Sequence, residues 1–328
     1  MDVVSVVVMA PILGPDLSFI SAVDPRVRVI DAGKADGETL DAALASADIL
    51  LFGYPVPAVL AGRAPHLAWA HHTQAGVSNL HNCDLWTSSV TLTSSRGVVA
   101  ASAIAEYAVA AAAFFARGLH EGTRQKQAGL FASSGYEMIG LRDATMGVVG
   151  YGGIGREVAR LARALGMRVL ATRRSVTARA YDTDGADCLL PAGELHQMAA
   201  ESDFLAVCAQ LTAETAGMID AGVFAALKPG AVLINVARGE EVEEDALIEA
   251  LVSGRLRGAV LDVYNGELAG RPPRPELVEL PQVLLTPHIS GRGDPSAREP
   301  VRRLFADNLH RFLHGEPLLN LVDRQRGY

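Results

Sequence analysis

TMGVVGYGGIG, residues 145–155 of this 328-residue chain, carries the clearest indication of the protein's fold. An apolar strand runs into a GxGxxG pattern, and the amphipathic segment GIGREVARLARALG follows. In such a turn the first glycine allows a tight bend, the second lets the backbone approach a pyrophosphate, and the third permits close helix–strand packing. The pattern predicts a dinucleotide site, and a purely structural glycine-rich turn is the alternative. The candidate cofactor residues are Gly150, Gly152, Gly153, Ile154 and Gly155.

The next strand, MRVLATRRS, ends in residues that choose between the two nicotinamide cofactors. An NAD enzyme usually carries Asp or Glu at this end to bind the ribose hydroxyls. Here Arg173, Arg174 and Ser175 stand instead, and two guanidinium groups with a hydroxyl suit a 2′-phosphate. We therefore expect NADP(H) to be preferred, with NAD(H) possible. The arginines could alternatively stack on the adenine or face solvent.

Strands alternate with helical segments on both sides of the glycine-rich turn, which implies right-handed βαβ units and parallel sheets. The sequence predicts an α/β protein with two doubly wound parallel-sheet domains, a Rossmann-type nucleotide domain of at least six strands and a flavodoxin-like substrate domain. The expected strands are VVSVVVM, VRVID, ADILLFG, LAWAHH and VTLTSS before the turn, then TMGVVGYG, MRVLATR, FLAVCAQL, GAVLINVAR, GAVLDVY and QVLLTPH.

The domain organisation follows from where the glycine-rich turn falls in the chain. Residues 1–100 and 289–328 are expected to form a substrate domain, and residues 101–288 the dinucleotide-binding domain. A long Ala-rich helix, Ala101 to about Leu119, leads into the second domain. A C-terminal helix over Ser296–Leu313 is expected to return to the first domain, so that two crossings join the domains across a cleft.

Composition excludes several classes of protein. Hydrophobic residues make up 49% of the chain, but no apolar run approaches the ~20 residues of a membrane span. The N-terminal MDVVSVVVMAP lacks a basic region, so it predicts a strand and not a signal peptide. A net charge of −8 argues against nucleic-acid binding. Cys83, Cys188 and Cys208 lack metal spacing, so we expect no metal site and reduced thiols in the cytoplasm.

Three polar residues follow late strands of the nucleotide domain: Arg238 after VLINVA, Glu267 after GAVLDVY, and His288 at the end of LLTPH. Ligands of open α/β sheets bind outside the carboxyl ends of the strands, where these residues lie. An arginine fork can hold a carboxylate, and a histidine can exchange a proton with a carbonyl oxygen. A carboxylate beside the histidine favours the imidazolium and orients the ring. Each residue alone could be a surface charge, but the combination predicts a catalytic site.

GVVGYGGIG, LKPGAVLINVARGE, GAVLDVYNGE and LLTPHISG together resemble the D-isomer-specific 2-hydroxyacid dehydrogenase family. HHTQAGVSNL and AIAEYAVA extend the resemblance over nearly the whole chain. It implies hydride transfer between NADP(H) or NAD(H) and a small 2-oxoacid or 2-hydroxyacid, in a homodimer paired through the nucleotide domain. It also implies Arg238 as substrate clamp, His288 as acid/base and Glu267 as its partner. The further residues implied are the substrate-binding Ala75, Gly76 and Val77 and the nicotinamide-pocket Thr212, Val236 and Asp262.

The sequence departs from the family pattern at several positions. Arg173 replaces the usual Asp, Leu268 the proline after the catalytic Glu, Gln210 a proline, and Asn79 an Asp. None of these removes a catalytic group, although Leu268 could loosen the loop that carries Glu267. Since the sequence stops after NLVDRQRGY, we expect no extra regulatory domain like that of longer phosphoglycerate dehydrogenases.

Other functions stay open from the sequence. One alternative is a non-catalytic NAD(H)-sensing protein like the family's corepressors, and another is oxidation of an oxyanion such as phosphite. Residues that could contact a substrate in the first domain are His71, His72 and Tyr54. The substrate's side chain and the physiological direction of the reaction cannot be deduced.

Overall fold

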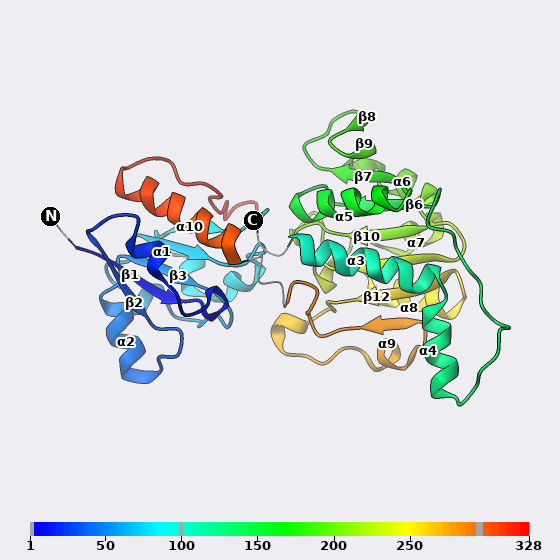
Figure 1. Cartoon of the computed structure of the whole chain (residues 1–328), viewed down its shortest axis with the longest axis horizontal. Helices are drawn as coiled ribbons and strands as arrows, with labels where there is room; N and C mark the ends of the chain where they lie inside the picture. Colours follow the sequence, from blue (N-terminus) through cyan, green and yellow to red (C-terminus); the bar gives the residue numbers. More distant parts are fainter. Residues whose placement is uncertain (1–2, 99–100, 293–297, 328) are drawn as a thin grey trace. The chain divides into compact units, whose positions relative to one another are not determined.

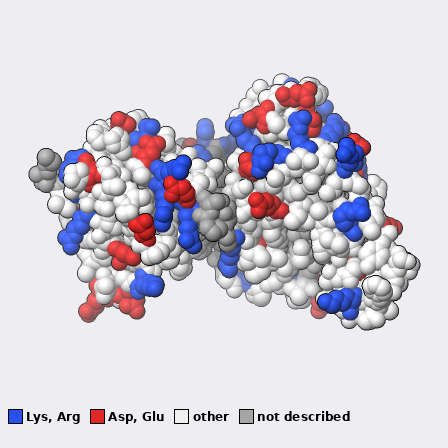
Figure 2. Space-filling view, viewed as in Figure 1, with Lys and Arg blue, Asp and Glu red and all other residues white. Residues whose placement is uncertain are grey.

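The computed structural model describes residues 3–98, 101–292 and 298–327 and divides into two compact units (Figure 1). The first unit consists of Met1–Val99 and Asp294–Tyr328, and the second of Ala100–Gly293. Figure 2 shows acidic and basic side chains interspersed on the visible face of each unit. The expected α/β class with two parallel-sheet domains is confirmed, and each unit has its own sheet and core.

The sheet of the first unit is parallel throughout, and its strands lie in the order β2-β1-β3-β4-β5. This is the strand order of flavodoxin, which agrees with the flavodoxin-like domain expected for this part of the chain. Strands β3 and β4 are buried along their whole length, as expected of a sheet covered on both faces. The strands are β1 (Val4–Met9), β2 (Val27–Asp31), β3 (Ile49–Phe52), β4 (Trp69–His72) and β5 (Thr91–Ser94), and the helices are α1 (Ser18–Ser21), α2 (Gly37–Ala45) and α10 (Arg298–Leu313).

The C-terminal segment packs on the first unit. Phe305 of α10 stacks on Trp69 of β4 with 5.1 Å between the ring centroids. After α10, the Val322 N–H donates to the Leu92 carbonyl at 2.9 Å, which ties the tail to strand β5. The start predicted for this helix, Ser296, lies outside the described residues, and the helix is described from Arg298.

His71, considered above as a substrate contact, is a structural residue of this sheet. Its side chain is fully buried, and its Nδ1 and Nε2 atoms lie 2.7 and 3.0 Å from the hydroxyls of Thr93 and Ser95. Burial lowers the pKa of His71 to about 3, so the ring is neutral. Both ring nitrogens are therefore used inside the sheet.

The second unit has a larger sheet, in the order β13-β12-β11-β10-β6-β7-β9-β8. Strands β6 and β10 are central and parallel. From β6 the chain adds strands toward one edge of the sheet, and from β10 it adds strands toward the other edge, as in a doubly wound nucleotide-binding sheet. Its strands are β6 (Thr145–Val149), β7 (Arg168–Arg173), β8 (Ala180–Thr183), β9 (Ala186–Pro191), β10 (Phe204–Val207), β11 (Ala231–Asn235), β12 (Leu256–Leu261) and β13 (Val283–Leu285). Its helices are α3 (Ala101–Ala116), α4 (Leu119–Gln127), α5 (Gly153–Ala164), α6 (Leu195–Glu201), α7 (Ala221–Ala226), α8 (Glu244–Val252) and α9 (Pro275–Glu279).

The sequence did not predict the hairpin of β8 and β9, which pair antiparallel. Strand β8 is mostly exposed and polar, so it lacks the hydrophobic pattern of a strand. The sequence nevertheless contains a hairpin-turn signal, the pair Asp184–Gly185. In the structure both residues adopt positive φ, at 58° and 86°. The short helix α4 was not among the elements expected from the sequence either, because its segment is polar and contains Gly122.

The Ala-rich helix α3 lies in the core of the second unit. Its small side chains Ala105, Ala108 and Ala112 are fully buried, and the helix packs against α5. It ends before Gly118, whose φ of 65° breaks the helix ahead of α4. Among the described residues no single helix is long and apolar enough to cross a membrane. Only α3 and α4 together reach that length and composition, and they are bent by 68°.

Candidate active site

Arg238, Glu267 and His288 come from three neighbouring strands of the second unit. Strands β11, β12 and β13 are parallel and adjacent, so their carboxyl ends lie at one edge of the sheet. Arg238 follows β11, Glu267 follows β12, and His288 follows β13. The sheet therefore delivers the predicted catalytic residues to the edge where α/β proteins bind ligands.

His288 and Glu267 form a close pair. The His288 Nδ1 atom lies 2.7 Å from Glu267 Oε1, and 36% of the His288 side chain is exposed. A carboxylate only accepts hydrogen bonds, so Nδ1 carries the proton that is shared with Glu267. Within the described residues Nε2 has no hydrogen-bond partner. The pair thus fixes the ring orientation and leaves Nε2 for an incoming substrate.

The backbone of His288 has a left-handed conformation that side chains other than glycine rarely adopt, with φ of 51°. Asp262, which is 1% exposed, holds this turn from beneath. Its backbone carbonyl accepts the His288 N–H at 2.9 Å, and its carboxylate accepts the N–H groups of Ile289 and Ser290 at 2.8 and 2.9 Å. The surrounding hydrogen bonds therefore compensate for the strain.

Asp262 was expected to accept a bond from a nicotinamide carboxamide. Its carboxylate already accepts three bonds, because the Thr286 hydroxyl also donates to Oδ1 at 2.6 Å. A carboxylate has about four acceptor sites, so one remains. The role of Asp262 toward a cofactor stays a prediction, and its role in holding the His288 turn is additional.

The loop that carries Glu267 is fixed by acidic side chains of the preceding segment. The N–H groups of Asn265 and Gly266 donate to the carboxylates of Glu244 and Glu240, at 2.9 and 3.2 Å. Gly266 has φ of 89°, which a side chain would strain. These bonds order the loop even though Leu268 replaces the usual proline.

Arg238 sits at the start of a single 3-10 turn, Gly239–Glu241. The Asn235 amide donates to the Arg238 carbonyl at 2.9 Å, and the Arg238 guanidinium donates to the Ala237 carbonyl at 2.6 Å. A Cβ atom at Gly239 would overlap the backbone of Tyr264. The loops after β11 and β12 therefore touch through their backbones, which brings the Arg238 turn beside the loop leading to Glu267.

Glu241, at the end of this turn, is a residue that the sequence reasoning missed. It is fully buried, its Oε2 accepts the Arg238 N–H at 3.2 Å, and its Oε1 has no hydrogen-bond partner among the described residues. Burial raises the pKa of Glu241 to about 8, and the nearby charge of Glu240 adds to this, against the lowering effects of Arg238. The doublet Glu240–Glu241 looks like a solvated charge pair in the sequence, so no local signal indicated burial.

The glycine-rich turn has the geometry of a phosphate-binding loop. Gly150 has φ of 92°, and a Cβ atom there would lie 2.6 Å from the Ala209 backbone. A Cβ atom at Gly155 would overlap the Gly150 carbonyl oxygen, so this glycine permits the packing of α5 on β6. A Cβ atom at Gly152 would meet no atom within 4 Å. The space beside Gly152, at the first N–H groups of α5, fits a bound pyrophosphate.

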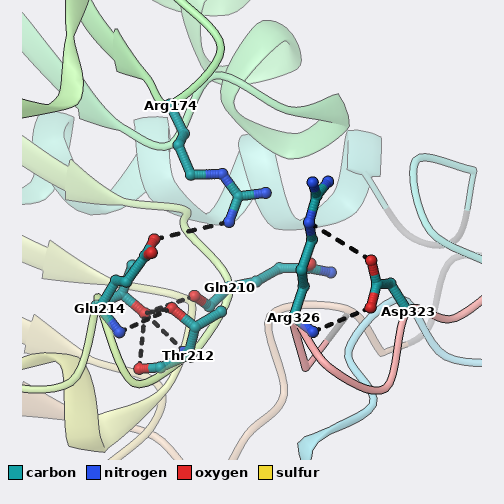
Figure 3. Close-up of polar contacts among 7 residues, drawn as sticks. Arg174, Gln210, Thr212, Glu214, Asp323 and Arg326 are labelled. Atoms are coloured by element: carbon teal, nitrogen blue, oxygen red, sulfur yellow. Dashed lines mark hydrogen bonds and ion pairs between the residues drawn. The ribbon is translucent and has the colours of Figure 1, made fainter.

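The predicted 2′-phosphate residues follow β7. Within the described residues the Arg173 guanidinium has no hydrogen-bond or ion-pair partner. Arg174 is directed toward Glu214, with 3.8 Å between the charged atoms (Figure 3), and Ser175 is exposed. Arg173, Arg174 and Ser175 themselves therefore offer cationic and hydroxyl groups, where an NAD enzyme usually has a carboxylate for the adenosine ribose.

The remaining predicted residues are placed as follows. The Thr212 hydroxyl lies in a turn, 3.2 Å from the Thr215 hydroxyl (Figure 3), and Val236 is buried just after β11. Ala75, Gly76 and Val77 follow β4 in the first unit, and their contact with a substrate stays a prediction. Among the described residues no group of three or more His, Cys, Asp or Glu side chains could hold a metal ion.

Comparison with known proteins links this site to a family. Residues 109–290 match the family model described as D-isomer specific 2-hydroxyacid dehydrogenase, NAD binding domain. A glyoxylate reductase of Thermococcus onnurineus is 39% identical over 191 residues, which cover 58% of this chain and 54% of that protein. A D-3-phosphoglycerate dehydrogenase of Mycobacterium leprae is 31% identical over 94% of this chain and 57% of its own length. The chain thus spans about half the length of these curated relatives.

Solved structures match over nearly the whole chain. A D-isomer specific 2-hydroxyacid dehydrogenase from Xanthobacter autotrophicus Py2, in complex with NADPH and MES, superposes with a TM-score of 0.80. It is 26% identical, and the match covers 99% of this chain and 100% of that one. An NADPH-dependent glyoxylate/hydroxypyruvate reductase from Sinorhizobium meliloti, in complex with NADP and sulfate, has a TM-score of 0.79 at 25% identity, with 99% and 100% covered.

Replacing Glu241 by Gln is expected to flatten the pH dependence of stability. The carboxyl ionises near 4.5 in the unfolded chain but only near 8 in the folded protein. The unfolded state therefore loses its proton first, and the free energy of unfolding falls by a few kcal/mol as the pH rises through this range. Urea unfolding at pH 5 and pH 8 measures this fall, which Glu241→Gln should lack.

The exposed Glu249 of α8 provides the control, and Glu249→Gln should follow the wild-type protein. An equal loss of stability between pH 5 and pH 8 in Glu241→Gln and the wild-type protein would contradict the prediction.

Proposed function

The chain belongs to the D-isomer specific 2-hydroxyacid dehydrogenase family, and from this premise we propose that it is an oxidoreductase that transfers a hydride between NADP(H) or NAD(H) and a small 2-oxoacid or 2-hydroxyacid. The observation that carries the proposal is the His288–Glu267 pair, 2.7 Å apart, at the same sheet edge as the glycine-rich turn. Reduction of a carbonyl group needs a proton donor beside the hydride donor. An imidazole held by a carboxylate at this edge can supply that proton.

Each catalytic side chain has a role that its contacts support. The Arg238 guanidinium binds the carboxylate of the 2-oxoacid and orients its carbonyl group. His288 donates a proton from Nε2 to the carbonyl oxygen in reduction, and accepts it in the reverse direction. Glu267 accepts the Nδ1–H bond, holds the ring in this tautomer and stabilises the imidazolium.

The cofactor supplies or accepts the hydride when bound, and the second unit provides its binding residues. The first N–H groups of α5 bind the pyrophosphate, and the open space beside Gly152 makes room for it. The Arg173 guanidinium, together with Arg174 and Ser175, binds the 2′-phosphate, which favours NADP(H) over NAD(H). Thr212, Val236 and Asp262 lie after the strands that would flank the nicotinamide. The NADPH and NADP in the similar solved structures support the same preference.

The first unit is the proposed substrate domain, with the backbone of Ala75, Gly76 and Val77 binding the substrate carboxylate. The proposed bounds are residues 1–100 and 289–328 for this domain and 101–288 for the dinucleotide-binding domain, whereas the compact units divide at Val99/Ala100 and at Gly293/Asp294. We further propose a cytoplasmic location, because Cys83, Cys188 and Cys208 are all free thiols.

The protein is also proposed to form a homodimer through the nucleotide domain. After α4 the chain runs along the outside of the second unit as an extended segment (Figure 1). Gln125 hydrogen-bonds to Ala132 and to Ser134, which orders this segment. It nevertheless exposes Leu130, Phe131 and Met138, and Phe131 is exposed completely. Large apolar side chains held in an exposed position favour contact with a second copy of the chain.

Wild-type protein is expected to consume NADPH with at least one member of a panel of 2-oxoacids that includes glyoxylate and hydroxypyruvate. His288→Ala should lower kcat by about 10²–10⁴-fold, since it removes the proton donor. The decrease in NADPH absorbance measures both. His196 is a matched control, because it is also part-exposed and lies 3.9 Å from a carboxylate, so His196→Ala should retain activity.

Two results would overturn the proposal. Turnover of phosphite with no turnover of any 2-oxoacid would assign the site to oxyanion oxidation. Cofactor binding without any turnover would favour a sensing protein.

Arg173→Asp should shift the preference from NADPH toward NADH. Loss of the charge-assisted bonds to a 2′-phosphate is expected to raise the KM for NADPH by about 10- to 100-fold. The new carboxylate should lower the KM for NADH by accepting bonds from the ribose. Steady-state kinetics with both cofactors measure the ratio, and Arg160→Asp on the exposed face of α5 is the control. An unchanged ratio in Arg173→Asp would refute the 2′-phosphate assignment.

Phe131→Glu is expected to convert the dimer into monomers, because it places a charge in the apolar contact. Light scattering coupled to size exclusion measures the mass of each species. Val252 is an equally apolar, exposed residue at the end of α8, so Val252→Glu should stay dimeric. A wild-type monomer, or a Phe131→Glu dimer, would exclude this interface.

A further inference from the structure

Three side chains from distant parts of the second unit form a continuous hydrogen-bond chain. The Tyr107 hydroxyl, on α3, lies 2.6 Å from the Thr286 hydroxyl. The Thr286 hydroxyl lies 2.6 Å from Oδ1 of Asp262. None of the proposed catalytic steps uses Tyr107 or Thr286, so this chain needs an explanation of its own.

The direction of the protons follows from what each group can do. An ionised carboxylate only accepts, so Thr286 donates its single hydroxyl proton to Asp262. Thr286 then has only acceptor capacity left, so Tyr107 must donate to it. Burial raises the pKa of the Tyr107 phenol, which keeps this donor protonated. Both hydroxyl protons are therefore directed toward Asp262.

Asp262 is the group that holds the His288 turn. Its carboxylate binds the N–H groups of Ile289 and Ser290, and its carbonyl binds the N–H of His288. The conformation of His288, with φ of 51°, is disfavoured by itself and depends on these bonds. A carboxylate that is free to rotate would hold them less well.

We propose that Tyr107 and Thr286 are positioning residues, whose hydroxyl relay locks the Asp262 carboxylate and thereby fixes the turn that presents His288 to the substrate. The effect on catalysis rests on the proposed function, but the effect on the turn does not. The relay reaches the reacting imidazole only through Asp262 and the backbone. It should therefore change the rate of proton transfer much more than the affinity for the cofactor, because the proposed phosphate contacts at Gly152 and Arg173 do not involve Asp262.

The test uses variants that remove hydroxyl groups and keep shape. Tyr107→Phe removes the first donor, Thr286→Val breaks both links, and Thr286→Ser restores a hydroxyl. Tyr181 on the exposed strand β8 supplies the control, since Tyr181→Phe loses a phenol without touching the relay. All variants are made in the full-length protein.

The first measurement is amide hydrogen exchange at Ile289 and Ser290 by NMR, which needs neither substrate nor turnover. Protection of these two amides should fall about five- to tenfold in Tyr107→Phe and further in Thr286→Val, because the bonds to Asp262 weaken. Thr286→Ser and Tyr181→Phe should keep wild-type protection. Equal protection in all variants would overturn the proposal, as would a loss spread evenly over the whole unit.

The second measurement is kinetic. Tyr107→Phe should lower kcat about tenfold and displace the pH profile of kcat, while the NADPH dissociation constant stays within twofold. The same substitution in a His288→Ala background should have little further effect, because both changes act through one group. An additive loss in the double variant, or a loss of NADPH affinity with kcat unchanged, would refute the positioning role. Failure of every 2-oxoacid would count against the proposed function alone, since the exchange measurement would still decide on the relay.

Discussion

The buried carboxylate of Asp262 holds the end of β13 against the end of β12, and the geometry of the site depends on this interaction. The carboxylate accepts hydrogen bonds from Thr286, Ile289 and Ser290, and the Asp262 backbone carbonyl accepts the His288 N–H, so this one residue sets the path of the chain after β13. A buried charge is stable only when its acceptor sites are used, and here three of them are. The requirement to satisfy this carboxylate therefore also places the imidazole of His288, the proposed acid/base.

The other loops at this edge are held by the same means, close backbone contact and acceptors that satisfy N–H groups. Gly239 lets the turn after β11 touch the backbone of the loop after β12. Glu240 and Glu244 then bind N–H groups of that second loop, which carries Glu267. Rigid strands carry the loops, and polar side chains between loops set their conformation. Such support is what holds a catalytic group in a productive orientation.

Two features of the site destabilise the fold locally. One is the buried carboxyl of Glu241, which binds the backbone of Arg238, and the other is the strained backbone of His288 itself. A buried carboxyl with one unpartnered oxygen costs free energy at neutral pH. A left-handed histidine costs free energy at every pH. Natural proteins concentrate such destabilising features at functional sites, where the rest of the fold compensates for them. Their position at one edge of one sheet agrees with the site assigned from the chemistry of the side chains.

The sequence alone predicted two parallel sheets with most of their strands and the glycine-rich turn, and it singled out Arg238, Glu267 and His288 as candidate catalytic residues. These features are encoded locally, because apolar strands, glycine spacing and residues directly after strands are read within a few positions. Only the tertiary structure decided which polar groups meet and which are buried. Tyr107 and Thr286 are 179 positions apart, and the burial of Glu241 depends on what packs over its turn. The polar strand β8 likewise forms only because β9 pairs with it. Long-range packing determines burial and hydrogen-bond partners, and no local pattern of residue types encodes it.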